Sequence, residues 1–306
     1  MTDNPTSLIR PFGGSLVERV AAGTEADALR EKAPDLPSVI LDAGEVADLE
    51  LLASGGASPL RGFMGHADYR RVLDERRMPN GLLFPLPLTA AVPVERLGTL
   101  SPGTEVALRD IGGGLRGTLR VDDTYVRDLR DEALRVYGTD DPGHAGVRAL
   151  RSRPAGAIGG EVRIVRPSGS AFETAREVRM RLARDGFYRV GAGFGAGLPE
   201  AASAMDGTVD ALLARSLAGD VAIPPKLPVV VARLPLHPRS AGPREALFQS
   251  LVLRNFGASH IVLGASRTDL RTADALVRYQ VELGLSFIQP ARTRASACNP
   301  SGLAAA

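Results

Sequence analysis

LPVVVARL at residues 227–234, followed by AGPREA at residues 241–246, is the stretch that decides the fold of this chain. The first segment is a continuous apolar run of the kind that forms a buried strand. In the second, Pro243 suits a first helical position, because its missing N–H would have no intrahelical partner there. Glu245 falls in the first turn, where the helix dipole favours a carboxylate. Such a helix start presents free N–H groups to an anion, and Arg239 adds a positive charge nearby. The stretch therefore predicts a strand–turn–helix corner, either an ordinary structural corner or an anion site.

The pattern of apolar residues around this corner alternates between helical and extended segments. Helices are predicted at residues 172–185, 209–217, 243–256 and 272–283, and strands at residues 188–192, 227–234, 260–264 and 285–289. Strands that alternate with helices predict a parallel α/β sheet. Ligands of such sheets bind at the carboxyl ends of the strands, near the point where the strand order reverses.

The first half of the chain is different, because short strands separated by turn residues dominate it. Residues 105–109 and 115–121 flank three consecutive glycines and predict a hairpin. Short helices are predicted at residues 47–53 and 128–136. The composition changes near residues 166–169, so we expect a β-rich domain at residues 1–166 and an α/β domain at residues 167–306.

Composition excludes several classes of protein. The 306 residues carry a formal net charge of only +2, which gives no argument for a nucleic-acid partner. Cys298 is the single cysteine, so neither an internal disulfide nor a cysteine metal cluster is expected. No spacing of His, Asp or Glu indicates a metal site. There is no apolar run of about 18 residues and no visible signal peptide, and we expect a cytoplasmic protein without a membrane partner.

Four motifs, one of which contains the corner at residues 241–246, give the chain a family resemblance. They are LIRPFGG at residues 8–14, GGASPLRGFM at residues 55–64, VYGTDDPGHAGV at residues 136–147 and PRSAGPREAL at residues 238–247. In sequence and order they resemble the ATP sulfurylases (sulfate adenylyltransferases), whose M-R-x-A-G-P-R-E-A segment helps to hold sulfate. The resemblance implies a PUA-like β domain followed by a Rossmann-like nucleotidyltransferase domain. It also implies adenylyl transfer from ATP, bound with Mg, to sulfate.

The two catalytic motifs of that family do not have counterparts here. Q-T-R-N-P-x-H-x-x-H should follow residues 186–190, but the chain continues with GAGFGAGLPE at residues 191–200. G-R-D-H-A-G should follow residues 260–262, but the chain reads LGASRTD, in which only Gly264 keeps its counterpart. Removal of one group that stabilises charge in a transition state costs about 3 kcal/mol or more. We therefore expect a divergent, shortened member with little ordinary sulfurylase activity.

The candidate site follows from the corner and from the two altered loops. The residues predicted to bind a nucleotide phosphate or oxyanion are Arg239, Ala241, Gly242, Arg244, Gly191, Gly193, Gly195, Gly197 and Gly264. His237 and Arg267 are the only candidates for a catalytic role. The glycine run at residues 191–197 also resembles a dinucleotide fingerprint, but Pro199 and Glu200 follow it at once and no acidic residue ends a second strand about 20 residues on, so a permissive loop is the better explanation.

Three functions remain open on the sequence. The chain is a divergent homologue that binds a nucleotide phosphate or oxyanion, an active adenylyltransferase with sulfate or another oxyanion as acceptor, or a non-catalytic partner of an active sulfurylase. Association into a homo-oligomer is compatible with each of them.

Overall fold

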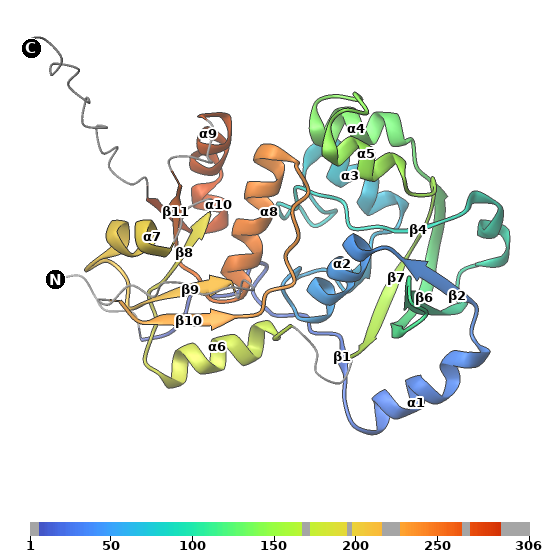
Figure 1. Ribbon diagram of the computed structural model, residues 1–306, viewed down its shortest axis with the longest axis horizontal. Coiled ribbons are helices and arrows are strands. Elements are labelled where there is room, and N and C mark those ends of the chain that lie inside the picture. The colour runs from blue at the N-terminus through green and yellow to red at the C-terminus, as the bar shows by residue number, and fades with distance from the viewer. Residues whose placement is uncertain (1–5, 167–171, 195–197, 216–226, 265–269, 289–306) are drawn as a thin grey trace, which may run out of the picture.

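The computed structural model describes residues 6–166, 172–194, 198–215, 227–264 and 270–288. Two β-sheets organise these residues, one in each half of the chain (Figure 1). A long helix, α8, lies between the second sheet and the elements of the first half.

The first sheet has seven strands and is mostly antiparallel. Its main path runs β1-β7-β6-β5-β2, and two short strands, β3 and β4, also pair with β7. The strands are β1 (Val20–Ala21), β2 (Ser38–Leu41), β3 (Gly62–Phe63), β4 (Ala90–Val92), β5 (Glu105–Asp110), β6 (Leu115–Val126) and β7 (Gly156–Val165). The predicted hairpin is β5–β6, where the carboxylate of Asp110 accepts hydrogen bonds from the N–H groups of Gly112 and Gly114.

Short helices surround this sheet, and their starts follow from local side-chain chemistry. They are α1 (Thr24–Lys32), η1 (Ala33–Asp35), α2 (Ala43–Ala53), α3 (His66–Glu75), η2 (Val94–Thr99), α4 (Leu129–Tyr137) and α5 (Ala145–Arg151). Asp42 and Glu45 form a reciprocal capping box at the start of α2, and Asp128 caps α4. The predicted helices at residues 47–53 and 128–136 are therefore confirmed as parts of α2 and α4.

The second sheet is entirely parallel, as the alternation of elements predicts. Its strands are β8 (Val190–Phe194), β9 (Ala211–Arg215), β10 (Val229–Ala232), β11 (His260–Leu263) and β12 (Ser286–Ile288), in the order β10-β9-β8-β11-β12. The chain begins in the middle at β8, adds β9 and β10 on one side, and then returns to add β11 and β12 on the other. The strand order thus reverses between β8 and β11, which is the place where ligands of this architecture bind.

Helices cover both faces of the second sheet. They are α6 (Ala175–Arg184), α7 (Leu198–Met205), α8 (Gly242–Asn255), α9 (Leu270–Arg278) and α10 (Gln280–Leu283). Successive residues of a strand point to opposite faces. Accordingly Leu212 belongs to the cluster around α7, whereas its neighbour Leu213 belongs to the large core that contains α8.

The helix predicted at residues 209–217 is wrong, because β9 occupies its centre and α7 supplies the helix upstream. A short apolar run buried on both faces of a sheet lacks the alternation that marks a half-exposed strand, so its periodicity does not separate strand from helix. The single helix predicted at residues 272–283 is divided into α9 and α10 at Tyr279.

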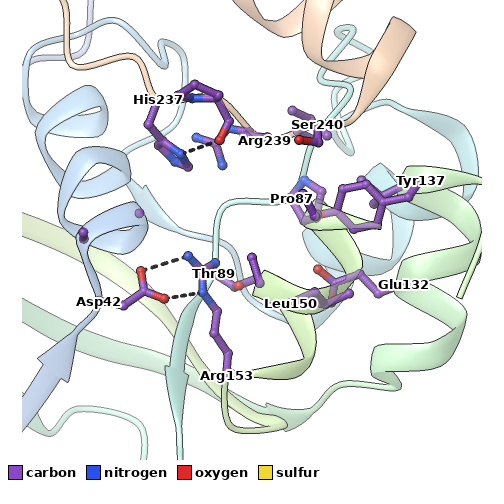
Figure 2. Close-up of a pocket in the computed structure, with 18 residues that line it drawn as sticks. Asp42, Pro87, Thr89, Glu132, Tyr137, Leu150, Arg153, His237, Arg239 and Ser240 are labelled. Carbon is purple, nitrogen blue, oxygen red and sulfur yellow. Dashed lines mark hydrogen bonds and ion pairs between the residues drawn. The ribbon is translucent and has the colours of Figure 1, made fainter. Parts of the chain in front are cut away.

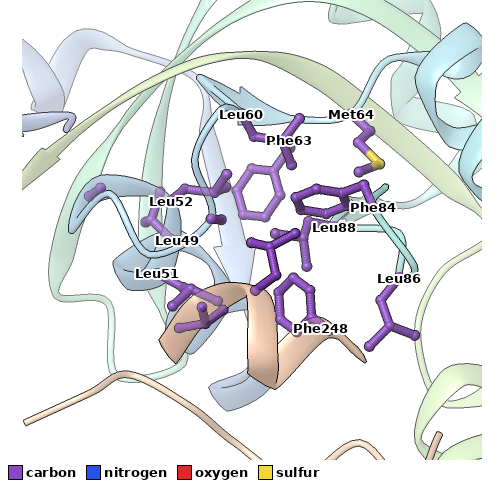
Figure 3. Close-up of a cluster of buried hydrophobic side chains, with 14 of the residues drawn as sticks. Leu49, Leu51, Leu52, Leu60, Phe63, Met64, Phe84, Leu86, Leu88 and Phe248 are labelled. Atoms are coloured by element: carbon purple, nitrogen blue, oxygen red, sulfur yellow. The ribbon is translucent and has the colours of Figure 1, made fainter. Parts of the chain in front are cut away.

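Helix α8 belongs to the cores of both halves. Phe248 lies edge-on against Phe84 of the first half, with ring centroids 5.6 Å apart, inside a cluster of leucine and aromatic side chains (Figure 3). At the end of α8, the buried side chain of Asn255 accepts a hydrogen bond from Phe12 N and donates to Gly56 O. These contacts fix the first half against the start and the end of α8, and so they fix the position of the corner at residues 237–245.

Candidate functional site

The carboxyl edge of the second sheet brings together two of the predicted glycines. Leu263 of β11 pairs with Phe194 of β8, and Val262 pairs with Gly193. Gly264 follows directly after β11, so Gly193 and Gly264 both lie at the reversal of strand order. Gly195, Gly197 and Arg267 lie outside the described residues.

Gly191 has a packing role in the structure. It lies at the beginning of β8, three residues before the carboxyl end of that strand. A Cβ added to it would come within 2.1 Å of the sulfur of Met205 and 3.0 Å of Leu212. Close packing of α7 on the sheet therefore requires a glycine here, whether or not a phosphate binds nearby.

The corner before α8 has an unusual backbone. Ser240 and Gly242 have φ angles of +56° and +51°, with Ala241 between them as the N-cap residue. Alternation of this kind turns successive N–H groups toward one side and forms a concavity suited to an anion. The chain supplies an anion of its own, because the carboxylate of Glu245 accepts hydrogen bonds from Arg239 N and Ala241 N, both at 3.1 Å.

The side chain of Arg239 is also engaged by a carboxylate. Its guanidinium contacts both carboxylate oxygens of Asp48 in α2 and lies over the ring of Phe248, 5.1 Å from the centroid. His237 Nε2 lies 3.3 Å from the same carboxylate. Burial alone would raise the pKa of Asp48, but the charge of Arg239 and the hydrogen bond from His237 outweigh it and lower the pKa to about 2. His237, Arg239 and Asp48 thus form one buried polar cluster.

Arg244 does not share this environment. Its guanidinium donates to the carbonyl oxygens of Val72, Leu73 and Pro85 at 3.2, 2.9 and 3.1 Å. Burial lowers its pKa to about 10. In this structure Arg244 joins the start of α8 to the end of α3, and it does not line the cavity beside Arg239.

That cavity lies between the two halves and has a volume of about 420 Å³. Residues of α2, α4 and α5 line it from one side, and residues 237–240 line it from the other (Figure 2). Arg153 projects into it and forms a two-point ion pair with Asp42, with distances of 2.6 and 2.9 Å. Neither Asp48 nor Arg153 was predicted from the sequence as a site residue, because no motif or spacing near either residue indicates a polar cluster. Tyr137 and Gly146 belong to the motif at residues 136–147, which was the one available indication of this wall.

The described residues also bear on metal and membrane binding. They contain no group of three or more His, Cys, Asp or Glu side chains arranged to hold a metal ion. None of their helices combines the length and apolarity needed to cross a membrane.

A β-rich sheet joined to a parallel α/β sheet, with a glycine-containing corner at the start of α8, is the architecture of a nucleotidyltransferase-like protein. Residues 9–167 match the PUA-like domain, and residues 216–286 match the ATP-sulfurylase family. The chain is 37% identical to a sulfate adenylyltransferase of Symbiobacterium thermophilum over 286 residues, which cover 84% of this chain and 72% of the relative. It is 33% identical to the sulfate adenylyltransferase of Trichormus variabilis over 294 residues, 86% of this chain and 74% of that one. The chain therefore belongs to the ATP sulfurylase family, which confirms the family and the fold class expected from its motifs.

Among solved structures, the fold is similar to one described as a hexameric APS kinase from Thiobacillus denitrificans. The TM-score is 0.68 at 26% sequence identity. The similarity covers 94% of this chain, and the chain spans a little over half, 57%, of that protein.

Proposed function

We propose that this chain is a divergent sulfate adenylyltransferase homologue that binds a nucleotide phosphate or oxyanion and has little or no ordinary sulfurylase activity. The binding residues would be Gly193 and Gly264 at the reversal of strand order, with the start of α8 beside them. ATP would enter with Mg as its substrate complex.

The observation that carries this proposal is the internal pairing of Arg239. A sulfate that used this guanidinium would have to draw it away from Asp48, whose side chain is only 2% exposed. Leaving one partner of a buried ion pair alone typically costs about 3–5 kcal/mol. That cost would be subtracted from the binding energy available to a transition state, which depends on charged groups that are already in position.

The backbone of the corner supports the same proposal. Glu245 already occupies the N–H groups of Arg239 and Ala241. Among the described backbone donors of the corner, the N–H groups of two exposed residues, Ser240 and Gly242, are the ones that a bound anion could use without displacing that carboxylate. Two such donors, together with Gly193 and Gly264, suit the binding of a nucleotide phosphate better than they suit catalysis.

Two measurements test the proposal. Pyrophosphate release from MgATP should stay at background with sulfate, selenate and molybdate, while the sulfate adenylyltransferase of Symbiobacterium thermophilum serves as the active control. Calorimetry should detect binding of ATP or adenosine phosphosulfate. Turnover with any acceptor would overturn the inactive assignment and support an adenylyltransferase of altered specificity. Absence of binding to both nucleotides, in protein with a cooperative melting transition, would overturn the binding assignment.

A second candidate, a non-catalytic partner of an active sulfurylase, is favoured by the solved relative that is described as hexameric. Co-production with the sulfurylase of the same organism, followed by native mass measurement, tests it. A mixed assembly with altered sulfurylase turnover supports this role, and two separate species contradict it.

A further inference from the structure

The cavity between the two halves touches the second sheet only through the corner at residues 237–240, which follows β10. Its described lining includes no residue of β8 or β11, the strands that carry Gly193 and precede Gly264. At about 420 Å³ it falls within the size range of small-molecule sites. The side chains of its lining decide which ligand chemistry it would recognise.

The side chain of Arg153 provides the clearest polar feature. It is 20% exposed, and its Nε and Nη2 are used on Asp42. Its Nη1 has no acceptor among the described residues, so this edge of the guanidinium faces the cavity (Figure 2). Burial alone would lower the pKa of Arg153, but the hydrogen bond to Asp42 and the charges of Glu45 and Asp42 raise it, so the group stays charged.

Gly44 makes room for this arrangement. A Cβ at Gly44 would lie 2.6 Å from Nη2 of Arg153 and 3.4 Å from Cε1 of His237. The absence of a side chain therefore lets the guanidinium of Arg153 and the imidazole of His237 both lie close to the start of α2. The capping box at the start of α2 uses only Asp42 and Glu45, so it does not itself require Arg153 and His237 to lie this close to Gly44.

The cations around the cavity are already compensated by carboxylates. Arg153 is paired with Asp42 and also lies in the field of Glu45, Arg239 is paired with Asp48, and Glu132 lies 3.6 Å from Arg127. A phosphate dianion would meet no uncompensated pair of cations here. A single carboxylate fits better, because one free edge of a guanidinium matches its planar geometry.

The rest of the lining includes the polar residues Thr89, Glu132 and Ser240 together with several apolar side chains. Leu86, Pro87, Val136 and Leu150 line the cavity, and the ring of Tyr137 points into it (Figure 2). A ligand that fills this volume needs an apolar or aromatic body in addition to its charged group.

We propose that this cavity binds a small organic monocarboxylate, with the carboxylate on the free edge of Arg153 and an apolar body between Tyr137 and Leu150. This site goes beyond the proposed nucleotide function and does not depend on it. Benzoate is a suitable probe, with benzyl alcohol as its uncharged analogue and inorganic phosphate as a compact anion.

Titration followed by protein NMR should show saturable binding of benzoate and at least about tenfold weaker binding of benzyl alcohol and of phosphate, because a charge-assisted hydrogen bond contributes about that factor or more. Arg153→Gln should weaken benzoate binding by a similar factor. Arg130→Gln is the matched control, because Arg130 also pairs with an aspartate but lies on the surface, away from the cavity.

Ala149→Phe tests the site without disturbing the ion pair, since Ala149 is an exposed residue of α5 that lines the cavity. The larger side chain should block benzoate while the melting temperature stays close to that of the wild type. The proposal would be overturned if benzoate still bound to folded Arg153→Gln and folded Ala149→Phe with the affinity of the wild type. It would also be overturned if phosphate bound the wild type as tightly as benzoate, or if benzoate did not bind at all. Displacement of benzoate by ATP would show that the cavity is the nucleotide site, and would overturn a separate site while leaving the proposed function intact.

Discussion

Asp48→Asn is the substitution that tests the internal pairing of Arg239 most directly. The asparagine keeps the shape of the side chain but removes the charge that faces Arg239 and His237. The guanidinium of Arg239, whose side chain is 12% exposed, would then be a buried cation without its partner. We expect the free energy of unfolding at pH 7 to fall by about 3–5 kcal/mol.

The pH dependence of this loss follows from the pKa of Asp48. The folded-state pKa is about 2 and the ordinary value is 3.8, a difference equivalent to about 2 kcal/mol. Since folding lowers the pKa of Asp48, this stabilisation is fully present at a pH well above 3.8, the pKa in the unfolded chain. It is lost as the pH falls from there through about 2, the pKa in the folded protein. The free energy of unfolding of the wild type should exceed that of Asp48→Asn by about 1 kcal/mol less at pH 3 than at pH 7.

Urea denaturation followed by far-ultraviolet circular dichroism measures both effects, and this readout is appropriate because the chain has no tryptophan. Asp140→Asn is the control, since Asp140 pairs with Arg130 on the surface and should change the urea midpoint little. The reasoning is refuted if Asp48→Asn costs no more than Asp140→Asn. It is equally refuted if the difference from wild type stays constant between pH 7 and pH 3.

Three further substitutions separate anion binding from packing. Glu245→Ala frees two backbone N–H groups, so sulfate should raise the melting temperature of this variant more than that of the wild type; equal shifts would show that the corner has no affinity for an anion. Gly191→Ala should lower the free energy of unfolding by about 1–3 kcal/mol, because the added Cβ crowds Met205. Its affinity for ATP in calorimetry should not change. A loss of ATP affinity without a loss of stability would instead indicate that a phosphate binds beside Gly191. Arg244→Leu should lower the free energy of unfolding, measured by urea denaturation, by about 2–4 kcal/mol, because three carbonyl groups lose their donor. A variant as stable as the wild type but with weaker sulfate binding would show that Arg244 binds the anion.

Much of the second sheet could be predicted because its strands are bounded by clear stop signals. Gly257 precedes β11 and Gly284 precedes β12, and each has a positive φ angle that favours glycine. The error at residues 209–217 has another cause: Gly207, with a positive φ angle, also precedes β9, but the run ALLA is buried on both faces and lacks the alternation that marks a strand. The division between the two predicted domains at residues 166 and 167 remains a prediction.

The site was less predictable, because its decisive contacts join distant parts of the sequence. Arg239 stands out near a strand end, yet its partner Asp48 lies 191 positions away and resembles any polar residue of an amphipathic helix. Glu245 was recognised as a favourable first-turn residue, but the sequence does not show that its carboxylate turns back onto the corner. Arg244 was assigned from its motif, whereas packing of α8 against the first half directs it toward α3.

The position of α8 has a consequence for how the molecule unfolds. Phe248 and Asn255 of this helix complete the interior of the first half, while Leu251 and Val252 are also fully buried. Neither half can lose its native structure without exposing apolar surface that the other half covers. The boundary that divides the two sheets in the sequence therefore does not separate two independent cores, and loss of structure in either half weakens the other.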